Sequence, residues 1–296
     1  ITNPGVPRMI KLFATDLDGT LLNAFHKVDR TIHRAVRTAT DAGAHVVVAT
    51  GRTFRRTSDF GFAGTGIDAA GCNGSLILNR EGEVIYHGVI DPAFLETMIR
   101  AFPQICFECV GVRNTYATGS FEERQAGFRT DRPLQRIAMV GMRRRRKLMS
   151  TDTLFSQPLS TILGHDICKV NARTADEALG RELTAFLADH QDTVVNTPFQ
   201  PVMFEITDKA DNKGAAVARL AAYYGIDEDE VAVYGDGGND LVMLDRFEHS
   251  FATSNASDAA KQAAGTVIGN CAFHAVPKHM LKTLRDQAAT QRYTTI

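Results

Sequence analysis

The chain has 296 residues, of which 44% are hydrophobic, and its formal net charge is −1 with a pI near 6.8. This length and composition allow one large domain or two ordinary ones with a sizeable core. The balanced charge argues against nucleic acid or an anionic membrane as a partner, and no apolar run approaches the roughly 20 residues that span a bilayer.

The first part of the chain predicts alternating strands and a helix. Asp29 is a suitable N-cap for the helix, and Gly43 follows its end. The β-branched run that ends at Thr50 predicts a buried strand. Polar residues follow two of the strands, at the edge where open parallel sheets bind ligands. The predicted elements are strands over 10–15, 44–50 and 68–78 and a helix over 30–42.

The last part of the chain repeats this alternation. Its first helix carries an apolar stripe and ends at Gly225, and the strand after it leads into the glycine-rich acidic turn GDGGND. The predicted elements are helices over 213–225, 255–265 and 274–289 and strands over 231–235 and 250–255.

The middle of the chain differs from both ends because its strand-like and helix-like runs follow no regular alternation. We interpret residues 85–208 as an α+β domain inserted into an α/β core made of residues 1–84 and 209–296. The core is predicted to be a Rossmann-like, doubly wound parallel sheet. The runs in the insertion are strands over 83–90, 105–113, 136–142, 166–172 and 202–207 and helices over 93–102 and 175–190.

Two carboxylates follow the first strand, in the sequence LFATDLDGTLLN. Asp16 and Asp18 are two residues apart, and two partly buried like charges need a cation or hydrogen-bond donors beside them. A carboxylate at a strand end can attack an electrophile, and the second can act as acid and base. A divalent cation would offset their repulsion.

A second acidic turn, GDGGND, supplies the other half of the predicted site. Asp236 and Asp240 offer oxygen ligands, and oxygen donors without nearby His or Cys favour Mg²⁺ over zinc. Thr50, in ATGR, offers a hydroxyl and flanking N–H groups. Lys213, in NKG, places a cation at a helix N-terminus, where anions are already favoured.

In this order and spacing, the four motifs resemble the haloacid dehalogenase superfamily of phosphohydrolases. The inserted middle domain resembles the class IIB α/β cap of its Cof-type branch, as do NGSLI and the FEIT…NKG segment. The resemblance implies that Asp16 is the nucleophile that forms an aspartyl-phosphate. It implies that Asp18 is the general acid and base and also gives its backbone carbonyl to the metal.

The resemblance also implies roles for the other residues of these motifs. Arg52 and Asn73 lie in loops that match the family, and the resemblance assigns them no specific role. The implied phosphate-binding residues are Thr50, Gly51, Lys213 and Asn239. The implied Mg²⁺-site residues are Asp16, Asp18, Asp236 and Asp240. Asp240 is either a direct ligand or a residue that orients a metal-bound water.

These observations predict a cytoplasmic Mg²⁺-dependent phosphatase for a small phosphorylated metabolite, a sugar phosphate or a phosphorylated cofactor. Two alternatives are a sugar phosphomutase, which shares the core, and a non-catalytic protein that binds a phosphorylated metabolite. A role in nucleic-acid binding is a weaker alternative that rests on the basic run Arg143–Lys147. We interpret that run as a solvated surface.

Three further features have simple interpretations. The five scattered cysteines indicate reduced thiols, and Cys106 and Cys109 are interpreted as ordinary residues of one strand. His26 follows the first motif closely enough to line the site. The first ten residues do not form a secretory signal, and we interpret Met9 as the start residue, preceded by an added segment.

Overall fold

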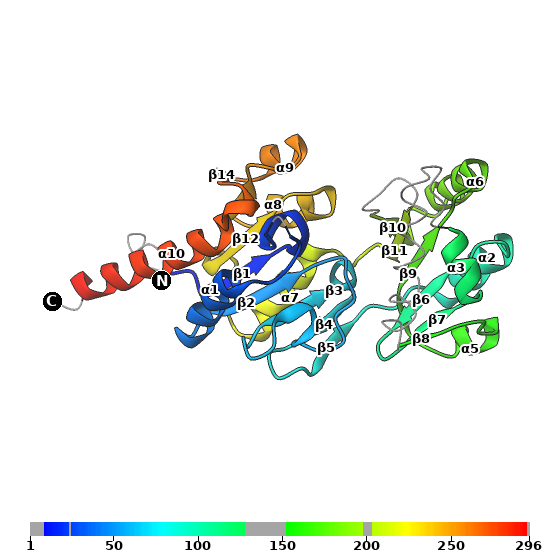
Figure 1. Ribbon diagram of the computed structural model, residues 1–296, viewed down its shortest axis with the longest axis horizontal. Helices are drawn as coiled ribbons and strands as arrows, with labels where there is room; N and C mark the ends of the chain where they lie inside the picture. The colour runs from blue at the N-terminus through cyan, green and yellow to red at the C-terminus, as the bar shows by residue number, and fades with distance from the viewer. Residues whose placement is uncertain (1–8, 24, 128–151, 198–202, 295–296) are drawn as a thin grey trace. The chain divides into compact units, whose positions relative to one another are not determined.

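The structure is a computed structural model that describes residues 9–23, 25–127, 152–197 and 203–294. The chain divides into two compact units, which Figure 1 shows with their elements labelled. The first unit comprises residues 1–86 and 211–296, and the second comprises residues 87–210. Among the described residues, no helix combines the length and the apolar character needed to cross a membrane.

The first unit is built on an eight-stranded sheet with the order β14-β13-β12-β1-β2-β3-β4-β5. The strands from β14 to β3 are parallel, and β4 is antiparallel to β3. The predicted doubly wound parallel core is therefore confirmed. The bounds are β1 Leu12–Thr15, β2 His45–Ala49, β3 Asp68–Gly71, β4 Leu76–Leu78, β5 Val84–His87, β12 Val231–Gly235, β13 His249–Thr253 and β14 Thr266–Ile268.

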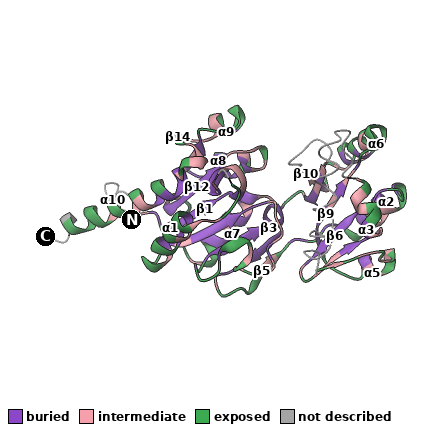
Figure 2. Ribbon diagram, in the orientation of Figure 1, coloured by how far each residue is buried: buried purple, intermediate pink, exposed green. Residues whose placement is uncertain are grey.

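Helices cover both faces of this sheet because the central strands are apolar on both sides. In β1, Phe13 packs against α1 and α10, whereas Leu12 and Ala14 pack against the side of α7, α8 and α9. Figure 2 shows the central strands buried and the outer helix surfaces exposed. The bounds are α1 Arg30–Asp41, α7 Lys213–Tyr223, α8 Leu241–Arg246, α9 Asp258–Ala263 and α10 Ala275–Thr294.

The strand order places a topological switch point between β1 and β12. The chain moves from β1 outward to β2 and β3 on one side, and later from β12 outward to β13 and β14 on the other. At such a switch point, outside the carboxyl ends of the strands, α/β sheets bind ligands. Asp16 and Asp236 are the first residues after these two strands.

Asp29 is the N-cap of α1, as predicted. Its Oδ1 accepts hydrogen bonds from the N–H groups of Thr31 and Ile32, and its Oδ2 accepts from Asn23 and His274. Partial burial alone would raise the pKa of Asp29, but these hydrogen bonds outweigh it and lower the pKa to about 2.

Asp29→Ala is expected to lower the free energy of unfolding by about 1 kcal/mol, the usual cost of losing an N-cap. Because the folded-state pKa lies below the unfolded value of 3.8, the stabilisation by Asp29 is present above pH 4. It is lost as the pH falls from about 4 towards about 2. Urea denaturation at pH 7 and pH 3 measures both effects. A difference between wild type and variant that grows at pH 3 would contradict the prediction.

The second unit is a six-stranded sheet with the order β10-β11-β9-β6-β7-β8, and helices pack on one face of it. Alternate residues of its central strands, such as Val170 and Ala172 of β9, form the core with Phe94 and Met98 of α2 and Leu183 of α6. The bounds are α2 Pro92–Ala101, β6 Glu108–Gly111, β7 Thr115–Ala117, α3 Phe121–Ala126, β8 Thr153–Leu154, α5 Leu159–Leu163, β9 Ile167–Arg173, α6 Glu177–Ala188, β10 Val194–Asn196 and β11 Met203–Asp208.

Several sequence-based predictions of elements are wrong in detail. The single strand predicted over 68–78 is two antiparallel strands, β3 and β4, joined by a turn at Cys72–Gly74. All three turn residues have positive φ, which reverses the chain direction inside an otherwise apolar run. The strand predicted over 83–90 is β5, which lies in the sheet of the first unit. Its Ile85 and Tyr86 pack against the α7 side of the core.

Other differences concern shorter segments. Cys106 precedes β6, so only Cys109 lies in the strand predicted to hold both. The five cysteines, all among the described residues, form no disulfide. The short elements β7, β8, β10, β14, α3, α5 and α8 were not predicted, because each is too short to show a hydrophobic period. The predicted strand over 136–142 and the basic run Arg143–Lys147 lie outside the described residues.

Candidate active site

The turn after β1 begins the site. The backbone N–H of Asp16 donates to the carbonyl of Tyr234 in β12 at 2.9 Å, which fixes the first acidic residue to the neighbouring strand. The turn then requires glycine at position 19. Gly19 has a φ of +84°, and a Cβ there would lie 2.2 Å from Oδ2 of Asp236. The glycine thus lets the two acidic loops approach closely.

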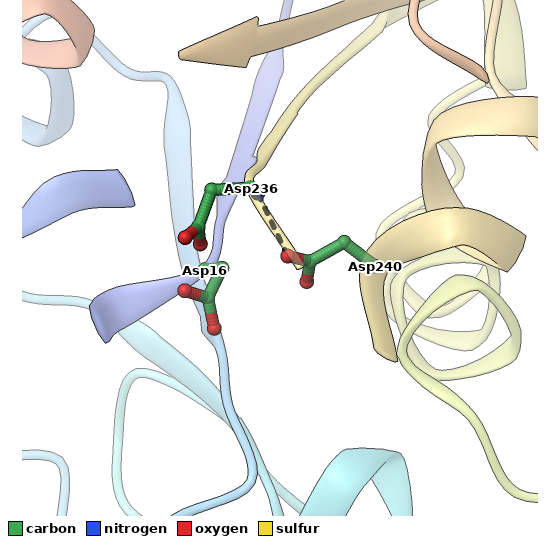
Figure 3. A group of neighbouring side chains, drawn as sticks. All are labelled: Asp16, Asp236 and Asp240. Atoms are coloured by element: carbon green, nitrogen blue, oxygen red, sulfur yellow. Dashed lines mark hydrogen bonds between the residues drawn. The ribbon is translucent and has the colours of Figure 1, made fainter. Parts of the chain in front are cut away.

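Figure 3 shows the carboxylates of Asp16, Asp236 and Asp240 gathered at one point, although they come from distant parts of the chain. One oxygen from each lies within 4.8 Å of the others. The ammonium group of Lys213, which is buried at the first position of α7, donates to Oδ1 of Asp16 at 2.6 Å and to Oδ1 of Asp240 at 2.7 Å. The structure therefore brings four predicted site residues together.

The electrostatics of this group favour a bound cation. Burial raises the pKa of Asp16, and the nearby carboxylates of Asp240 and Asp236 add to the rise, whereas Lys213 opposes it. Burial would lower the pKa of Lys213, but Asp16 and Asp240 outweigh burial and raise it, so Lys213 is cationic. One ammonium faces three carboxylates. The remaining negative charge and the all-oxygen donor set fit Mg²⁺.

Asp240 has a different environment from the other two carboxylates. Its Oδ2 accepts hydrogen bonds from the backbone N–H groups of Asp236 and Gly237, both at 2.9 Å, and its Oδ1 accepts from Lys213. These contacts close the turn after β12 and hold the lysine in place. The sequence left open whether Asp240 binds the metal directly or orients a metal-bound water, and both roles stay predictions.

Asp18 lies outside the group of three carboxylates. Its side chain forms a two-pronged ion pair with Arg52, with 2.7 Å from Nε to Oδ2 and 2.5 Å from Nη2 to Oδ1. His26 Nδ1 lies 3.5 Å from Oδ1 of Asp18, so His26 does line this part of the loop cluster. The metal contact expected from the backbone carbonyl of Asp18 stays a prediction.

The sequence of the chain matches one known protein family. A sequence profile described as haloacid dehalogenase-like hydrolase matches residues 13–280, from β1 to α10. The chain belongs to the haloacid dehalogenase-like hydrolases.

Individual relatives agree with this assignment over most of the chain. Phosphatase YwpJ of Bacillus subtilis (strain 168) is 27% identical and covers 93% of this chain and 100% of its own length. The Escherichia coli (strain K12) phosphatase YbjI, named for 5-amino-6-(5-phospho-D-ribitylamino)uracil, is 25% identical and covers 94% and 98%. A haloacid dehalogenase-like hydrolase from B. subtilis has a structure with a TM-score of 0.75 at 24% identity, over 92% of this chain and 99% of that one.

One relative carries a different name. The chloroplastic endoribonuclease YBEY of Arabidopsis thaliana is 25% identical over 284 residues, which are 89% of this chain. The match spans only 44% of that longer protein. Its printed activity is therefore not assigned to the matched part.

The remaining predicted residues of this hydrolase lie at the neighbouring strand ends. Thr50 is buried after β2, and its hydroxyl accepts from the backbone N–H of Arg52 at 3.2 Å. Its own N–H donates to a carbonyl of β3, so the expected flanking donors at Thr50 and Arg52 are already bonded. Gly51 lies between them. Asn73, with a φ of +57°, accepts from Asn239 at 3.1 Å, which links the turns after β3 and β12.

Sequence reasoning missed two polar residues of the candidate site. The hydroxyl of Thr20 donates to Oδ1 of Asp236 at 2.8 Å, and the amide of Asn255 donates to the carbonyl of Gly19 at 2.7 Å. Thr20 belongs to the DGT part of the first motif, so a signal was present. Asn255 follows β13, and only the sheet order brings it to the first loop.

Thr20→Val is expected to weaken Mg²⁺ binding by about 10- to 100-fold, because the isosteric valine no longer orients the carboxylate of Asp236. Isothermal titration calorimetry of the metal measures this change. Thr31→Val, at an exposed position in α1, is the matched control. Equal affinity in Thr20→Val and wild type would contradict a role for the Thr20 hydroxyl in orienting Asp236 for metal binding.

Proposed function

We propose that this hydrolase is a Mg²⁺-dependent phosphatase that removes the phosphoryl group from a small phosphorylated metabolite through an aspartyl-phosphate on Asp16. The observation that carries the proposal is the buried carboxylate of Asp16 held at 2.6 Å by Lys213, beside Asp236. A fixed carboxylate at the switch point of the sheet, with a cation that can also contact a phosphoryl oxygen, suits nucleophilic attack on phosphorus.

The first step forms a bond between a carboxylate oxygen of Asp16 and the phosphorus atom. The ester bond from phosphorus to the leaving oxygen breaks, and Asp18, which enters this step as the protonated carboxylic acid, gives that oxygen its proton. Lys213 balances charge and donates no proton, because its two carboxylate partners keep it cationic. The hydroxyl of Thr50 and the amide of Asn239 are proposed to contact the phosphoryl oxygens.

The second step releases inorganic phosphate. Water attacks the phosphorus atom and gives a proton to Asp18, and the bond between phosphorus and Asp16 breaks. Asp16 and Asp236 would hold Mg²⁺ through their carboxylates and Asp18 through its backbone carbonyl, with Asp240 orienting the loop. When bound, the ion would neutralise charge on the transferring phosphoryl group.

We propose that the second unit, residues 87–210, is a cap that selects the substrate. Its independent apolar core supports an autonomous domain, and the YbjI relative carries the name of a phosphatase for a phosphorylated ribityl compound. Small phosphorylated metabolites of the sugar-phosphate or cofactor type are the substrate class that we propose.

Phosphate release from a panel of phosphorylated metabolites and 4-nitrophenyl phosphate tests the proposal. We expect release with Mg²⁺, loss of release with EDTA, and recovery when excess Mg²⁺ is added. Transfer of labelled phosphate between two positions of a sugar without release would favour a phosphomutase. Binding of an ester without any turnover, in a protein that also binds Mg²⁺, would favour the non-catalytic alternative.

A further inference from the structure

Phe60 has a backbone conformation that its side chain does not favour. Its φ is +57° and ψ is 16°, within a short turn at Asp59–Gly61, and the side chain remains 40% exposed. A bulky residue in the left-handed region is an outlier, and such strain is often found at functional sites. The turn is secured by Asp59, whose Oδ2 accepts from the N–H groups of Arg55 and Arg56 at 2.8 and 3.0 Å.

The ring of Phe60 is fixed on two sides. It packs edge-to-face on the buried ring of Phe54, with 4.8 Å between the centroids. The guanidinium carbon of Arg52 lies 5.0 Å from the Phe60 centroid, which is the geometry of a cation–π contact. The same guanidinium group donates hydrogen bonds to both carboxylate oxygens of Asp18. A continuous series of contacts therefore runs from Phe54 through Phe60 and Arg52 to Asp18.

We propose that Arg52 and Phe60 are positioning residues that fix the direction of the Asp18 carboxylate for proton transfer. This inference rests on the proposed function. It gives Arg52, whose role the sequence left open, a role at Asp18. The planar guanidinium fork fixes the plane of a carboxylate in a way that a lysine ammonium group does not. Phe60 in turn limits the rotation of the guanidinium group.

The dependence of the rate on the leaving group separates these two roles of Arg52. The value of kcat/KM reports the steps up to departure of the leaving group. An alkyl oxygen needs a proton from Asp18 as it leaves, whereas 4-nitrophenolate leaves without one. Loss of Asp18 positioning therefore affects alkyl esters selectively. Loss of a phosphate contact affects both classes of ester equally.

The experiment compares Arg52→Gln and Arg52→Lys with wild type, using 4-nitrophenyl phosphate and an alkyl phosphate that the wild type hydrolyses. We expect kcat/KM for the alkyl ester to fall about 100-fold, near the lower end of general acid–base contributions, and that for the nitrophenyl ester less than about fivefold. Arg37→Gln, which removes an exposed guanidinium group from α1, is the matched control and should leave both values unchanged.

Phe60 variants extend the test. Phe60→Leu should lower kcat/KM for the alkyl ester by about 2- to 5-fold, the equivalent of an exposed cation–π contact, and Phe60→Tyr should restore it. An equal fall for both esters in the Arg52 variants would overturn the inference in favour of phosphate binding. Wild-type values in Arg52→Gln would also overturn it. Absence of hydrolysis by the unmodified protein would instead overturn the proposed function and this inference with it.

Discussion

Asp16→Asn is expected to abolish phosphate release, with kcat reduced on the order of 10⁴-fold or more, as for other removed nucleophiles. The amide oxygen of asparagine is a poor nucleophile, so no covalent phosphoryl intermediate forms. Release of phosphate from the best substrate of the panel, at saturating Mg²⁺, measures the loss. Labelling with ³²P-phosphoryl substrate should mark wild type and leave the variant unmarked.

Two further variants, Asp18→Asn and Asp41→Asn, are compared with Asp16→Asn by the same phosphate-release assay. Asp18→Asn should reduce kcat by about 10²–10⁴-fold, because only proton transfer is lost. Asp41→Asn removes an exposed carboxylate at the end of α1 and should not change kcat. Turnover near the wild-type value in a folded Asp16→Asn protein would exclude Asp16 as the nucleophile.

Lys213→Met is expected to lower the free energy of unfolding by about 3–5 kcal/mol without Mg²⁺, because it leaves the buried carboxylates of Asp16 and Asp240 facing each other without a counter-charge. Methionine keeps most of the volume of lysine, so packing is largely retained. Urea denaturation followed by circular dichroism measures the effect. The loss should become smaller as the pH falls, because protonation of the carboxylates relieves their repulsion.

Lys11→Met is the matched control for that prediction. Lys11 pairs with Glu230 at 2.7 Å in the same unit, but its side chain is half exposed. An exposed pair contributes about 0–1 kcal/mol, so this variant should remain close to wild type. Similar stabilities of the two variants would show that the buried ammonium group is not needed to hold the acidic loops together.

The location of the site has a direct structural cause. Parallel strands end at one edge of a sheet, and the winding direction changes between β1 and β12, which makes this edge the place where an α/β sheet binds its ligand. The acidic turns after these strands face each other across that point, and the N-terminus of α7 adds Lys213. The same fold therefore concentrates negative charge and provides a partial counter-charge for it.

The sequence by itself determined the order of the main elements and the chemistry of the loops. Hydrophobic periods predicted the long strands and helices of the core, because burial on one or both faces leaves a repeating signal in the chain. The DLDGT and GDGGND motifs and NKG predicted which side chains carry charge. The sequence was also enough to assign the family, because its profile match covers residues 13–280.

Only the tertiary structure decided which of these side chains touch. Asp16, Lys213 and Asp240 meet within hydrogen-bond distance although they are far apart in the chain, and Asp18, two residues from Asp16, pairs instead with Arg52. Thr20 and Phe60 acquire their neighbours in the same way. Sequence patterns record local spacing, whereas contacts between loops depend on strand order and register, which form only when the sheet assembles.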